Sequence, residues 1–334
     1  MFALYAYLSK FANIYKYMKV TDHIAQAKDT LVSFEILPPL KGKTINTIYN
    51  NLDPFMEFKP SFINVTYHRI ETMFKKKADG TFEKVEVKKR PGTVAICAAI
   101  KNHYNVDTVP HLICGGFTKR DTEDALIDLS FLGIDNVLVL RGDAAKNEAN
   151  FEPEVGGHAY AVDLQKQVVN LRNGLYLEED IKNGGKADFC IGTAGYPEKH
   201  FEAPNLETDM RHLKEKVDAG ADYIMTQMFF DNQKFFDFVK SCRNMGIDVP
   251  IIPGLKPITN KKQLSILPKV FHVDIPADLS NAILKAKTDE DVEQIGTEWL
   301  IQQSKELKAF GVPVLHYYTL GKQHVILDVV RAIR

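Results

Sequence analysis

Residues 109–140 read VPHLICGGFTKRDTEDALIDLSFLGIDNVLVL and contain two apolar runs separated by a helical pattern. The two runs, 109–114 and 136–140, are almost continuously apolar, which is typical of strands that are covered on both faces. The segment between them has Thr118 near its start, acidic residues in its early part and Gly133 at its end, and these are common signals of helix boundaries. A strand, a helix and a second strand in this order predict parallel strands joined by a right-handed helical crossover.

The same alternation continues along the chain from residue 31. Residues 206–220 form a second helical pattern that is apolar-periodic and ends in a glycine just before another strand. Eight strands that alternate with helices favour a closed (β/α)8 barrel in a single domain, with an open doubly wound sheet as the alternative. The eight predicted strands are residues 31–36, 61–66, 109–114, 136–140, 188–193, 223–227, 249–253 and 312–317.

Two segments depart from this alternation. Residues 1–30 begin with an apolar, aromatic stretch whose lysines lie within or after it, which does not fit a secretory signal. We expect an amphipathic helical extension, with a start codon placed too early as the alternative. Residues 71–90 are rich in lysine and carry an Ala-Asp-Gly turn signal between two β-like halves, which predicts an exposed hairpin after the second strand. We therefore expect an N-terminal helical extension followed by a catalytic barrel over residues 31–334.

The composition narrows the class of partner. The 334 residues include 42 Lys+Arg and 43 Asp+Glu, for a net charge of −1, so the chain lacks the basic footprint of a nucleic-acid-binding protein. No stretch approaches the roughly 20 consecutive apolar residues that a membrane-spanning helix needs. The four cysteines are far apart and form no CxxC pair, which is typical of buried thiols in a reducing compartment. We expect a soluble cytoplasmic protein that binds a small molecule, not nucleic acid or a membrane.

Glu35 is the first candidate functional residue, because function in a (β/α)8 barrel sits at the C-terminal ends of the strands. It lies between Phe34 and Ile36, and a carboxylate among apolar strand residues is costly unless it is paired, protonated or functional. Burial would raise its pKa, which suits a general acid near neutral pH. A glutamate neutralised by a neighbouring lysine or arginine is the alternative.

Three further polar positions lie on strands or at strand ends. The motif LRGD (140–143) combines a glycine, which lets a backbone approach a ligand closely, with two opposite charges; an Arg–Asp ion pair at a loop edge is the alternative. Gln227 ends the sixth predicted strand, and its amide suits the edge of a heterocycle. His111 lies three residues before Cys114, and side chains three apart on a strand point to opposite faces, so we expect no metal there. A buried core histidine is the alternative to a ligand-binding role for His111.

These strand ends, taken together, resemble the methylenetetrahydrofolate reductases, which are flavoenzymes built on a (β/α)8 barrel. The strings occur in the family's order from about residue 30 to residue 334, and the ordered set is more specific than any one string. They are SFEILPP (33–39), INVTYHR (63–69), PHLIC (110–114), LRGD (140–143), GYPEKH (195–200), KVDAGADYIMTQMFFD (216–231) and IIPGLKPITN (251–260).

The resemblance implies an activity and its cofactors. FAD would bind non-covalently at the barrel mouth, and NADH or NADPH would reduce it and leave in a ping-pong reaction. 5,10-Methylenetetrahydrofolate would then receive the hydride and become 5-methyltetrahydrofolate, which feeds methionine synthesis. We expect a homo-oligomer of the short form, without the large regulatory domain and without control by S-adenosylmethionine. A flavin-free pterin-binding barrel that transfers a methyl group and a non-catalytic folate-binding barrel are the two alternatives.

The resemblance also implies roles for individual residues. Glu35 matches the general acid that helps to open the five-membered ring of the folate, Asp143 matches an aspartate near flavin and pterin, and Gln227 matches a glutamine that contacts folate and nicotinamide in turn. Two positions depart from the family, since Leu267 replaces a substrate-stacking Phe and Lys322 replaces an Arg that meets the folate's glutamate tail. Lys322 keeps the charge but loses the bidentate fork. The positions that match FAD contacts are Thr66, Tyr67, Arg69, His111, Leu140, Arg141, Gly142, Asp143, Ala161, Tyr196, His200, Asp209 and Lys216.

Overall fold

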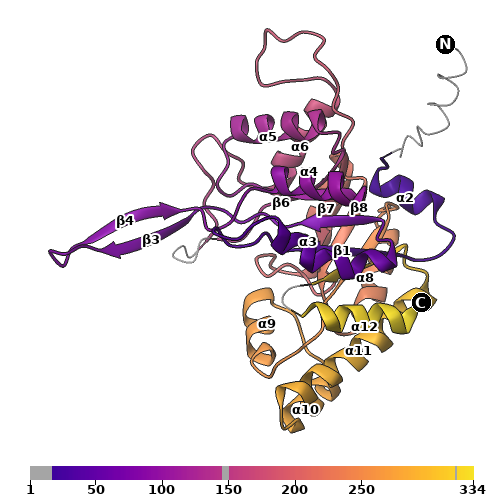
Figure 1. Cartoon of the computed structure of the whole chain (residues 1–334). Coiled ribbons are helices and arrows are strands. Elements are labelled where there is room, and N and C mark those ends of the chain that lie inside the picture. The colour runs from indigo at the N-terminus through magenta and orange to yellow at the C-terminus, as the bar shows by residue number, and fades with distance from the viewer. Residues whose placement is uncertain (1–16, 145–149, 320–321) are drawn as a thin grey trace, which may run out of the picture.

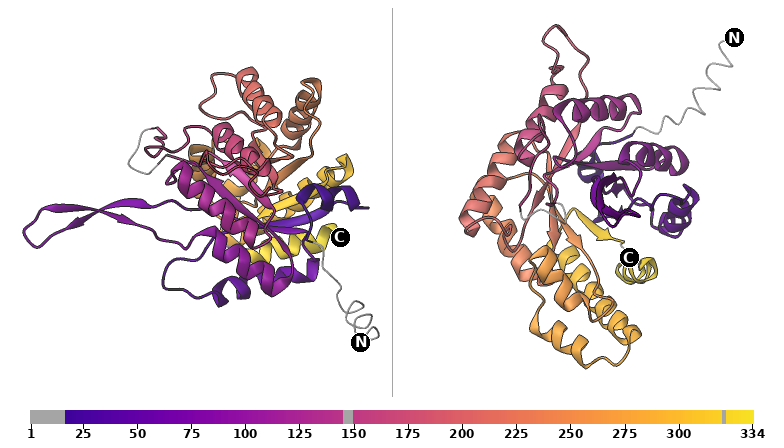
Figure 2. Two further views of the ribbon diagram at one scale, coloured as in Figure 1. Left: turned by 90° about the horizontal axis from the view of Figure 1, so that it is seen from above. Right: turned by 90° about the vertical axis from the view of Figure 1, so that its left-hand side faces the viewer.

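Eight parallel strands close into a barrel, and helices surround it (Figure 1 and Figure 2, right). The computed structural model describes residues 17–144, 150–319 and 322–334. The strands follow the order β1-β10-β9-β8-β7-β6-β5-β2 around the barrel, which confirms the predicted (β/α)8 fold over an open sheet. The barrel strands are β1 (Leu31–Ile36), β2 (Phe62–Val65), β5 (Asp107–Ile113), β6 (Asn136–Leu140), β7 (Cys190–Gly195), β8 (Tyr223–Met228), β9 (Ile251–Leu255) and β10 (Val314–Tyr318).

The helices begin and end at the signals that the sequence provides. Thr118 caps α5 by accepting a hydrogen bond from the backbone nitrogen of Asp121, and Gly133 adopts a φ of 64° just beyond the end of this helix. Such a left-handed residue is typical of a helix C-terminus. The helical elements are α2 (Val20–Gln26), α3 (Asn46–Leu52), η1 (Asp53–Phe58), α4 (Thr93–Tyr104), α5 (Lys119–Phe131), α6 (Ala161–Arg172), α7 (Leu206–Asp218), α8 (Asn232–Asn244), α9 (Gln263–Phe271), α10 (Ala277–Lys285), α11 (Asp289–Phe310) and α12 (Gln323–Ile333).

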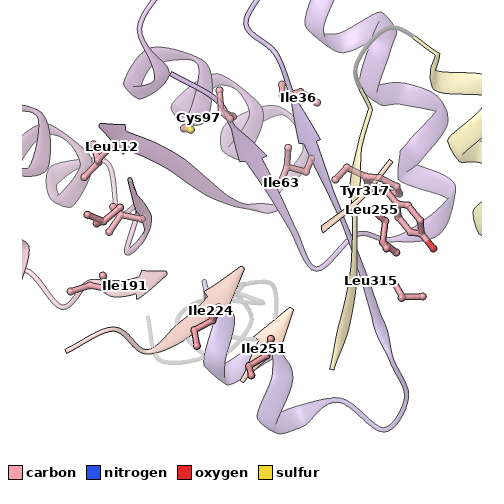
Figure 3. Close-up of a cluster of buried hydrophobic side chains, with 14 of the residues drawn as sticks. Ile36, Ile63, Cys97, Leu112, Ile191, Ile224, Ile251, Leu255, Leu315 and Tyr317 are labelled. Carbon is pink, nitrogen blue, oxygen red and sulfur yellow. The ribbon is translucent and has the colours of Figure 1, made fainter. Parts of the chain in front are cut away.

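Side chains along each strand alternate between the barrel interior and the layer beneath the helices. On β1, Phe34 and Ile36 belong to the large outer cluster, and the ring of Phe34 lies 4.4 Å from that of Phe55. Figure 3 shows part of this outer layer, including Ile63 and Tyr317 from neighbouring strands. Ser33 and Glu35, which alternate with Phe34 and Ile36 on β1, therefore face the interior. Glu35 is the later of the two and lies at the barrel mouth.

The helix α2 covers the N-terminal end of the barrel. Val20 is fully buried and packs with interior residues such as Phe62 and Val109. Asn136, at the start of β6, accepts a hydrogen bond from the backbone nitrogen of Val20 at 2.8 Å and donates one to the carbonyl of Met18 at 3.0 Å. This part of the predicted extension is thus helical, whereas its first 16 residues lie outside the described part of the chain.

The predicted hairpin is present. β3 (Glu71–Lys76) and β4 (Phe82–Val87) pair antiparallel as a separate two-stranded sheet. The hairpin projects far from the body of the barrel (Figure 1 and Figure 2, left). Phe74 and Phe82 on it are 63% and 65% exposed, so it adds little to the hydrophobic core.

The boundaries of β9 differ from the predicted strand 249–253 by two residues. Pro253 lies inside β9, although proline lacks the N–H that a central strand needs. The pairing register of β8 with β9 shifts between Met225 and Met228, and this irregularity accommodates the proline.

Two simple features complete the fold. All four cysteines are buried and free, as the sequence predicts for reduced thiols. No helix in the described ranges is both long enough and apolar enough to cross a membrane.

Candidate active site

Glu35 lies inside the barrel near its mouth, between two histidines. It is 7% exposed, and its Oε2 lies 3.4 Å from Nε2 of His111 and 3.7 Å from Nε2 of His316. His111 comes from β5 and His316 from β10, on opposite sides of β1 in the barrel. Closure of the barrel therefore brings together one carboxyl group and two imidazoles from three separate strands.

Burial governs the protonation of this cluster. Burial raises the pKa of Glu35, whereas the charges of His111 and Lys256 act to lower it. Burial lowers the pKa of His316 to about 3, and it also lowers the pKa of His111 against the opposing charge of Glu35. Both imidazoles are therefore neutral near neutral pH, and the carboxyl group keeps its proton to higher pH than an exposed glutamate does. This is the state that a general acid requires.

The alternative explanation of Glu35, an ion pair with a lysine or arginine, does not hold among the described residues. The basic side chains within 4.0 Å of its carboxylate are the two histidines, and both are buried. The charge of Lys256 acts on Glu35 without forming an ion pair within that distance. Glu35 is thus a buried acid that has no ion pair with a lysine or arginine among the described residues.

Hydrogen bonds orient the two imidazoles. Asn64 Nδ2 donates to Nε2 of His111 at 3.2 Å, so the proton of the neutral His111 ring lies on Nδ1. Nδ1 of His316 is 2.8 Å from the hydroxyl of Ser33. Nε2 of His316 and Oδ1 of Asn64 have no hydrogen-bond partner within the described residues. Buried polar atoms that lack partners indicate a site that completes its hydrogen bonds with a ligand.

Residues from β8 and β10 form the adjoining part of the mouth. The hydroxyl of Tyr318 donates to the carbonyl of Thr226 at 2.8 Å, and burial raises the pKa of Tyr318. Oε1 of Gln227 accepts a hydrogen bond from the backbone nitrogen of Met228 at 2.9 Å. This bond fixes the amide of Gln227, while its NH2 group has no partner among the residues described and is free to meet a ligand.

The LRGD motif follows β6. The guanidinium of Arg141 binds the carboxylate of Glu202 through two hydrogen bonds of 2.5 and 2.7 Å, so the alternative of an Arg141–Asp143 ion pair is wrong. Gly142 has a φ of 83°, in the left-handed region that favours glycine. Asp143 is exposed. Burial raises the pKa of Tyr196 and the charge of Asp143 adds to this effect, whereas burial lowers the pKa of His68 and the charge of Asp143 partly opposes it.

The loop after β7 is tied to α7. The backbone nitrogen of His200 donates to Oδ2 of Asp209 at 3.0 Å, and Nζ of Lys216 donates to the carbonyl of Ala194 at 2.5 Å. The side chain of Lys216 keeps some surface exposure, but its ammonium group is enclosed, and this burial lowers its pKa to about 8. The ring of Tyr196 meets that of His200 edge-on at 4.7 Å. These contacts hold two aromatic side chains and a cation beside Arg141.

Most of the positions that match FAD contacts lie within or just after four neighbouring strands, β2, β5, β6 and β7, and thus form one continuous band. Arg69 packs so closely on the loop after β5 that a Cβ on Gly115 would lie 3.2 Å from its Nη1. Arg141 lies 5.1 Å from the ring of Phe151, and Tyr67 lies 4.9 Å from Phe117. Guanidinium and ammonium groups beside aromatic rings and glycine backbone fit a flat, anionic cofactor such as FAD.

Three predicted positions lie apart from this band. Ala161 is the first residue of α6. The ammonium of Lys322 forms an ion pair of 2.7 Å with Glu293 of α11. Leu267 is 2% exposed and packs with Met228 in a separate apolar cluster, so it serves the core here. No group of three His, Cys, Asp or Glu side chains that could hold a metal is found in the described ranges.

Four residues of the site, Asn64, Lys256, His316 and Tyr318, are not among the predicted positions. The signal that could have found them is alternation, because His316 and Tyr318 occupy every second position of an apolar strand, as Ser33 and Glu35 do. A polar residue that recurs with this period in an apolar strand points into the barrel.

The fold and this site define a (β/α)8 barrel with a buried acid at its mouth. The family model for methylenetetrahydrofolate reductase matches residues 19–334, and the chain belongs to that family. It is 33% identical over 317 residues to methylenetetrahydrofolate reductase (NADH) 1 of Arabidopsis thaliana, which covers 91% of this chain and 49% of the relative. It is 32% identical over 294 residues to the 5,10-methylenetetrahydrofolate reductase of Salmonella typhimurium, covering 87% and 86% of the two chains.

The relatives differ in length from this chain. It spans about half the length of the plant, yeast and nematode relatives that it matches. Among solved structures, an uncharacterized protein from Clostridium thermocellum that binds two copies of 5-methyl-5,6,7,8-tetrahydrofolic acid superposes with a TM-score of 0.56. It is 14% identical and covers 94% of this chain and 97% of its own, and at this identity it shows the fold alone.

Proposed function

We propose that this protein reduces 5,10-methylenetetrahydrofolate to 5-methyltetrahydrofolate, with NADH or NADPH as the reductant and FAD as the cofactor. The observation that carries the proposal is the buried carboxyl group of Glu35 at the barrel mouth, 3.4 Å from a neutral histidine. Family membership supports the reaction, since relatives are named for the NADH-dependent and the NADPH-dependent reductase. The product is a methyl donor for methionine synthesis.

Glu35 acts as the acid that opens the five-membered ring of the folate. Its proton moves to the nitrogen that leaves the bridging carbon, and the electron pair of the broken C–N bond stays on that nitrogen. The remaining iminium carbon is then an acceptor for hydride. Because burial raises the pKa of Glu35, the acid keeps its proton to higher pH than an exposed glutamate does.

FAD, when bound, supplies a hydride acceptor for the nicotinamide and a hydride donor for the folate. Arg141, His200 and Lys216 would hold its anionic part, and Gly142 admits a close backbone approach because it lacks a Cβ. Asp143 and Gln227 would orient the substrate at the mouth. The two substrates use this mouth in turn, which makes the reaction ping-pong.

The visible absorption spectrum of the purified protein tests the proposal. A flavin spectrum that bleaches with anaerobic NADH or NADPH and recovers when methylenetetrahydrofolate is added is the expected result. Purification without flavin, together with no uptake of added FAD, would overturn it in favour of a methyl-transferring or non-catalytic folate-binding barrel.

A further inference from the structure

Lys256 is a buried cation at the barrel mouth to which the family resemblance assigns no role. It is 8% exposed and directly follows Leu255, the last residue of β9. Alternation places it on the same side of the strand as Gly254, whose missing side chain leaves room for the hydroxyl of Tyr318 inside the barrel. Among the described residues it forms no ion pair within 4.0 Å and no hydrogen bond. A lysine side chain that is largely buried and whose ammonium has no such partner is unusual, so its position requires an explanation.

The strand register places Glu35 and Lys256 at the same level of the barrel, because Leu255 pairs with Tyr317 on β10 and Glu35 pairs with the next residue, Tyr318. Burial lowers the pKa of Lys256, and the Glu35 carboxylate opposes this effect. The other titratable groups around Glu35 are His111 from β5, His316 from β10 and Tyr318 at the end of β10. Burial makes both imidazoles neutral and keeps Tyr318 protonated, since it lowers the pKa of each histidine and raises that of Tyr318. Within the described part of the chain, Lys256 is therefore the positive charge available to a Glu35 carboxylate.

We propose that Lys256 is a positioning residue for Glu35, and that its buried ammonium stabilises the carboxylate left behind when Glu35 has donated its proton. The inference rests on the proposed function, because the folate step is where Glu35 gives up that proton. In this step the O–H bond of Glu35 breaks, its electron pair stays on the carboxylate, and an N–H bond forms on the folate. Lys256 keeps its own proton throughout.

The physical reason is the cost of a bare carboxylate in the barrel. Neutral imidazoles offer hydrogen bonds but no compensating charge, whereas a nearby ammonium favours the ionised form of the acid. The positive charge is fixed before the reaction begins, so it needs no reorganisation when the negative charge develops. Lys256 thus makes Glu35 a stronger acid than burial alone would allow.

Lys256→Met tests this role, because methionine keeps the apolar length of the side chain and removes the charge. The titration of the Glu35 carboxyl group should move to higher pH. Infrared difference spectroscopy measures this titration through the C=O stretch of the protonated carboxyl group. The band is assigned to Glu35 by its loss in Glu35→Gln. The alkaline limb of the folate-reduction rate should move in the same direction, and its plateau should fall by about 3- to 30-fold because the acid is weaker.

Three variants serve as controls. Lys256→Arg keeps the charge and should retain the wild-type titration of Glu35. Lys256→Gln also removes the charge, so it should shift the Glu35 titration as Lys256→Met does and replaces that variant if it does not fold. Lys101 is a matched control, because it is 5% exposed and its pKa is also lowered by burial, yet it donates to the carbonyl of Gly133 near the other end of the barrel. Lys101→Met should leave the Glu35 titration unchanged.

An unchanged Glu35 titration in Lys256→Met would overturn the inference, and so would an equal shift in Lys101→Met. The infrared titration does not depend on turnover. If the wild-type protein fails to reduce the folate, the proposed function fails, while the titration still decides whether Lys256 acts on Glu35.

Discussion

The two ends of the barrel use the same side chain in opposite ways. Asn136 at the N-terminal end is 2% exposed, and both atoms of its amide are bonded to the backbone of the segment that leads into α2. Asn64 near the mouth is fully buried, and its Oδ1 has no partner among the described residues. The asparagine at the covered end thus satisfies its amide within the chain, whereas the one near the mouth leaves its oxygen without a partner.

The bonded asparagine at the covered end contributes to the stability of the barrel, whereas the unpartnered one at the mouth is available to a ligand. A buried polar atom without a partner costs roughly 1–3 kcal/mol, so the Oδ1 of Asn64 lowers stability whereas the fully bonded amide of Asn136 does not. Asp107, at the covered end, accepts a hydrogen bond from the backbone nitrogen of Met18 at 3.0 Å, and its Oδ2 lies 2.8 Å from Nε2 of His23. Substitutions at the two ends should therefore have different consequences.

The largest expected effect is at the mouth. Glu35→Gln should lower the rate of folate reduction by about 10²–10⁴-fold, because the amide cannot supply the proton. FAD binding and the oxidation of NADH by a quinone acceptor should persist, since neither needs this acid. Stopped-flow measurement of the two half-reactions separates these outcomes.

Glu123 provides the matched control for that experiment. It is 6% exposed and burial raises its pKa, but it lies on α5, where it accepts a hydrogen bond from the backbone nitrogen of Leu177. Glu123→Gln should leave both half-reactions unchanged. Equal loss of both half-reactions in Glu35→Gln would show instead that Glu35 supports the structure.

The next effect compares the two asparagines directly. Asn136→Ala should lower the free energy of unfolding by about 1–3 kcal/mol, because it leaves Val20 N and Met18 O without partners. Asn64→Ala should cost less stability, since it removes an unpartnered oxygen, but should slow folate reduction. Urea unfolding and single-turnover rates measure the two quantities. An equal loss of stability in both variants would contradict the contrast between the two ends.

A smaller effect concerns the cofactor. Arg141→Lys should weaken FAD binding by about tenfold, because lysine cannot form the charge-assisted bidentate contact. The free energy of unfolding should change little, since the ion pair with Glu202 is partly exposed. Flavin fluorescence titration measures the affinity. Arg172→Lys, at the ion pair with Asp222, is the control and should leave FAD affinity unchanged.

The smallest expected effect is a pH dependence of stability at Lys216. Its pKa in the folded protein is about 8, below the value of an unfolded lysine, so the unfolded chain binds more protons between the two values. The contribution of Lys216 to stability therefore rises with pH from about 8 to about 10, by at most about 1.4 kcal/mol per pH unit. Urea unfolding of the wild type and Lys216→Met across this range measures the difference. A difference that does not change with pH would contradict the burial of the ammonium.

Local sequence predicts the strands well where apolar runs begin and end sharply. The predicted bounds of β1 and β6 are confirmed to the residue, whereas β9 is shifted because Pro253 lies within the strand and not at its end. The apolar neighbours of Glu35 in this strand, Phe34 and Ile36, were enough to indicate a buried carboxyl group. The strand pattern is a local property, and so it can be read from a short segment.

The partners of the site residues could not be predicted in this way. His316 lies beside Glu35 because β10 pairs with β1, and Glu202 binds Arg141 across 61 positions of the chain. Such contacts depend on the stagger of the closed barrel, which no local pattern encodes. The roles that the resemblance implies for Asp143, Gln227 and the FAD-contacting residues stay predictions until ligands are measured.

The pairing of β1 with β10 also sets an order of events during synthesis. Ser33 and His316 are 2.8 Å apart yet separated by 283 positions, so the barrel closes only after nearly the whole barrel sequence has left the ribosome. Contacts of such long sequence separation form slowly, and the half-built sheet has open edges while it waits. Until that last strand arrives, Glu35 has no His316 beside it. The cluster of one carboxyl group and two imidazoles is therefore assembled only when the fold is complete.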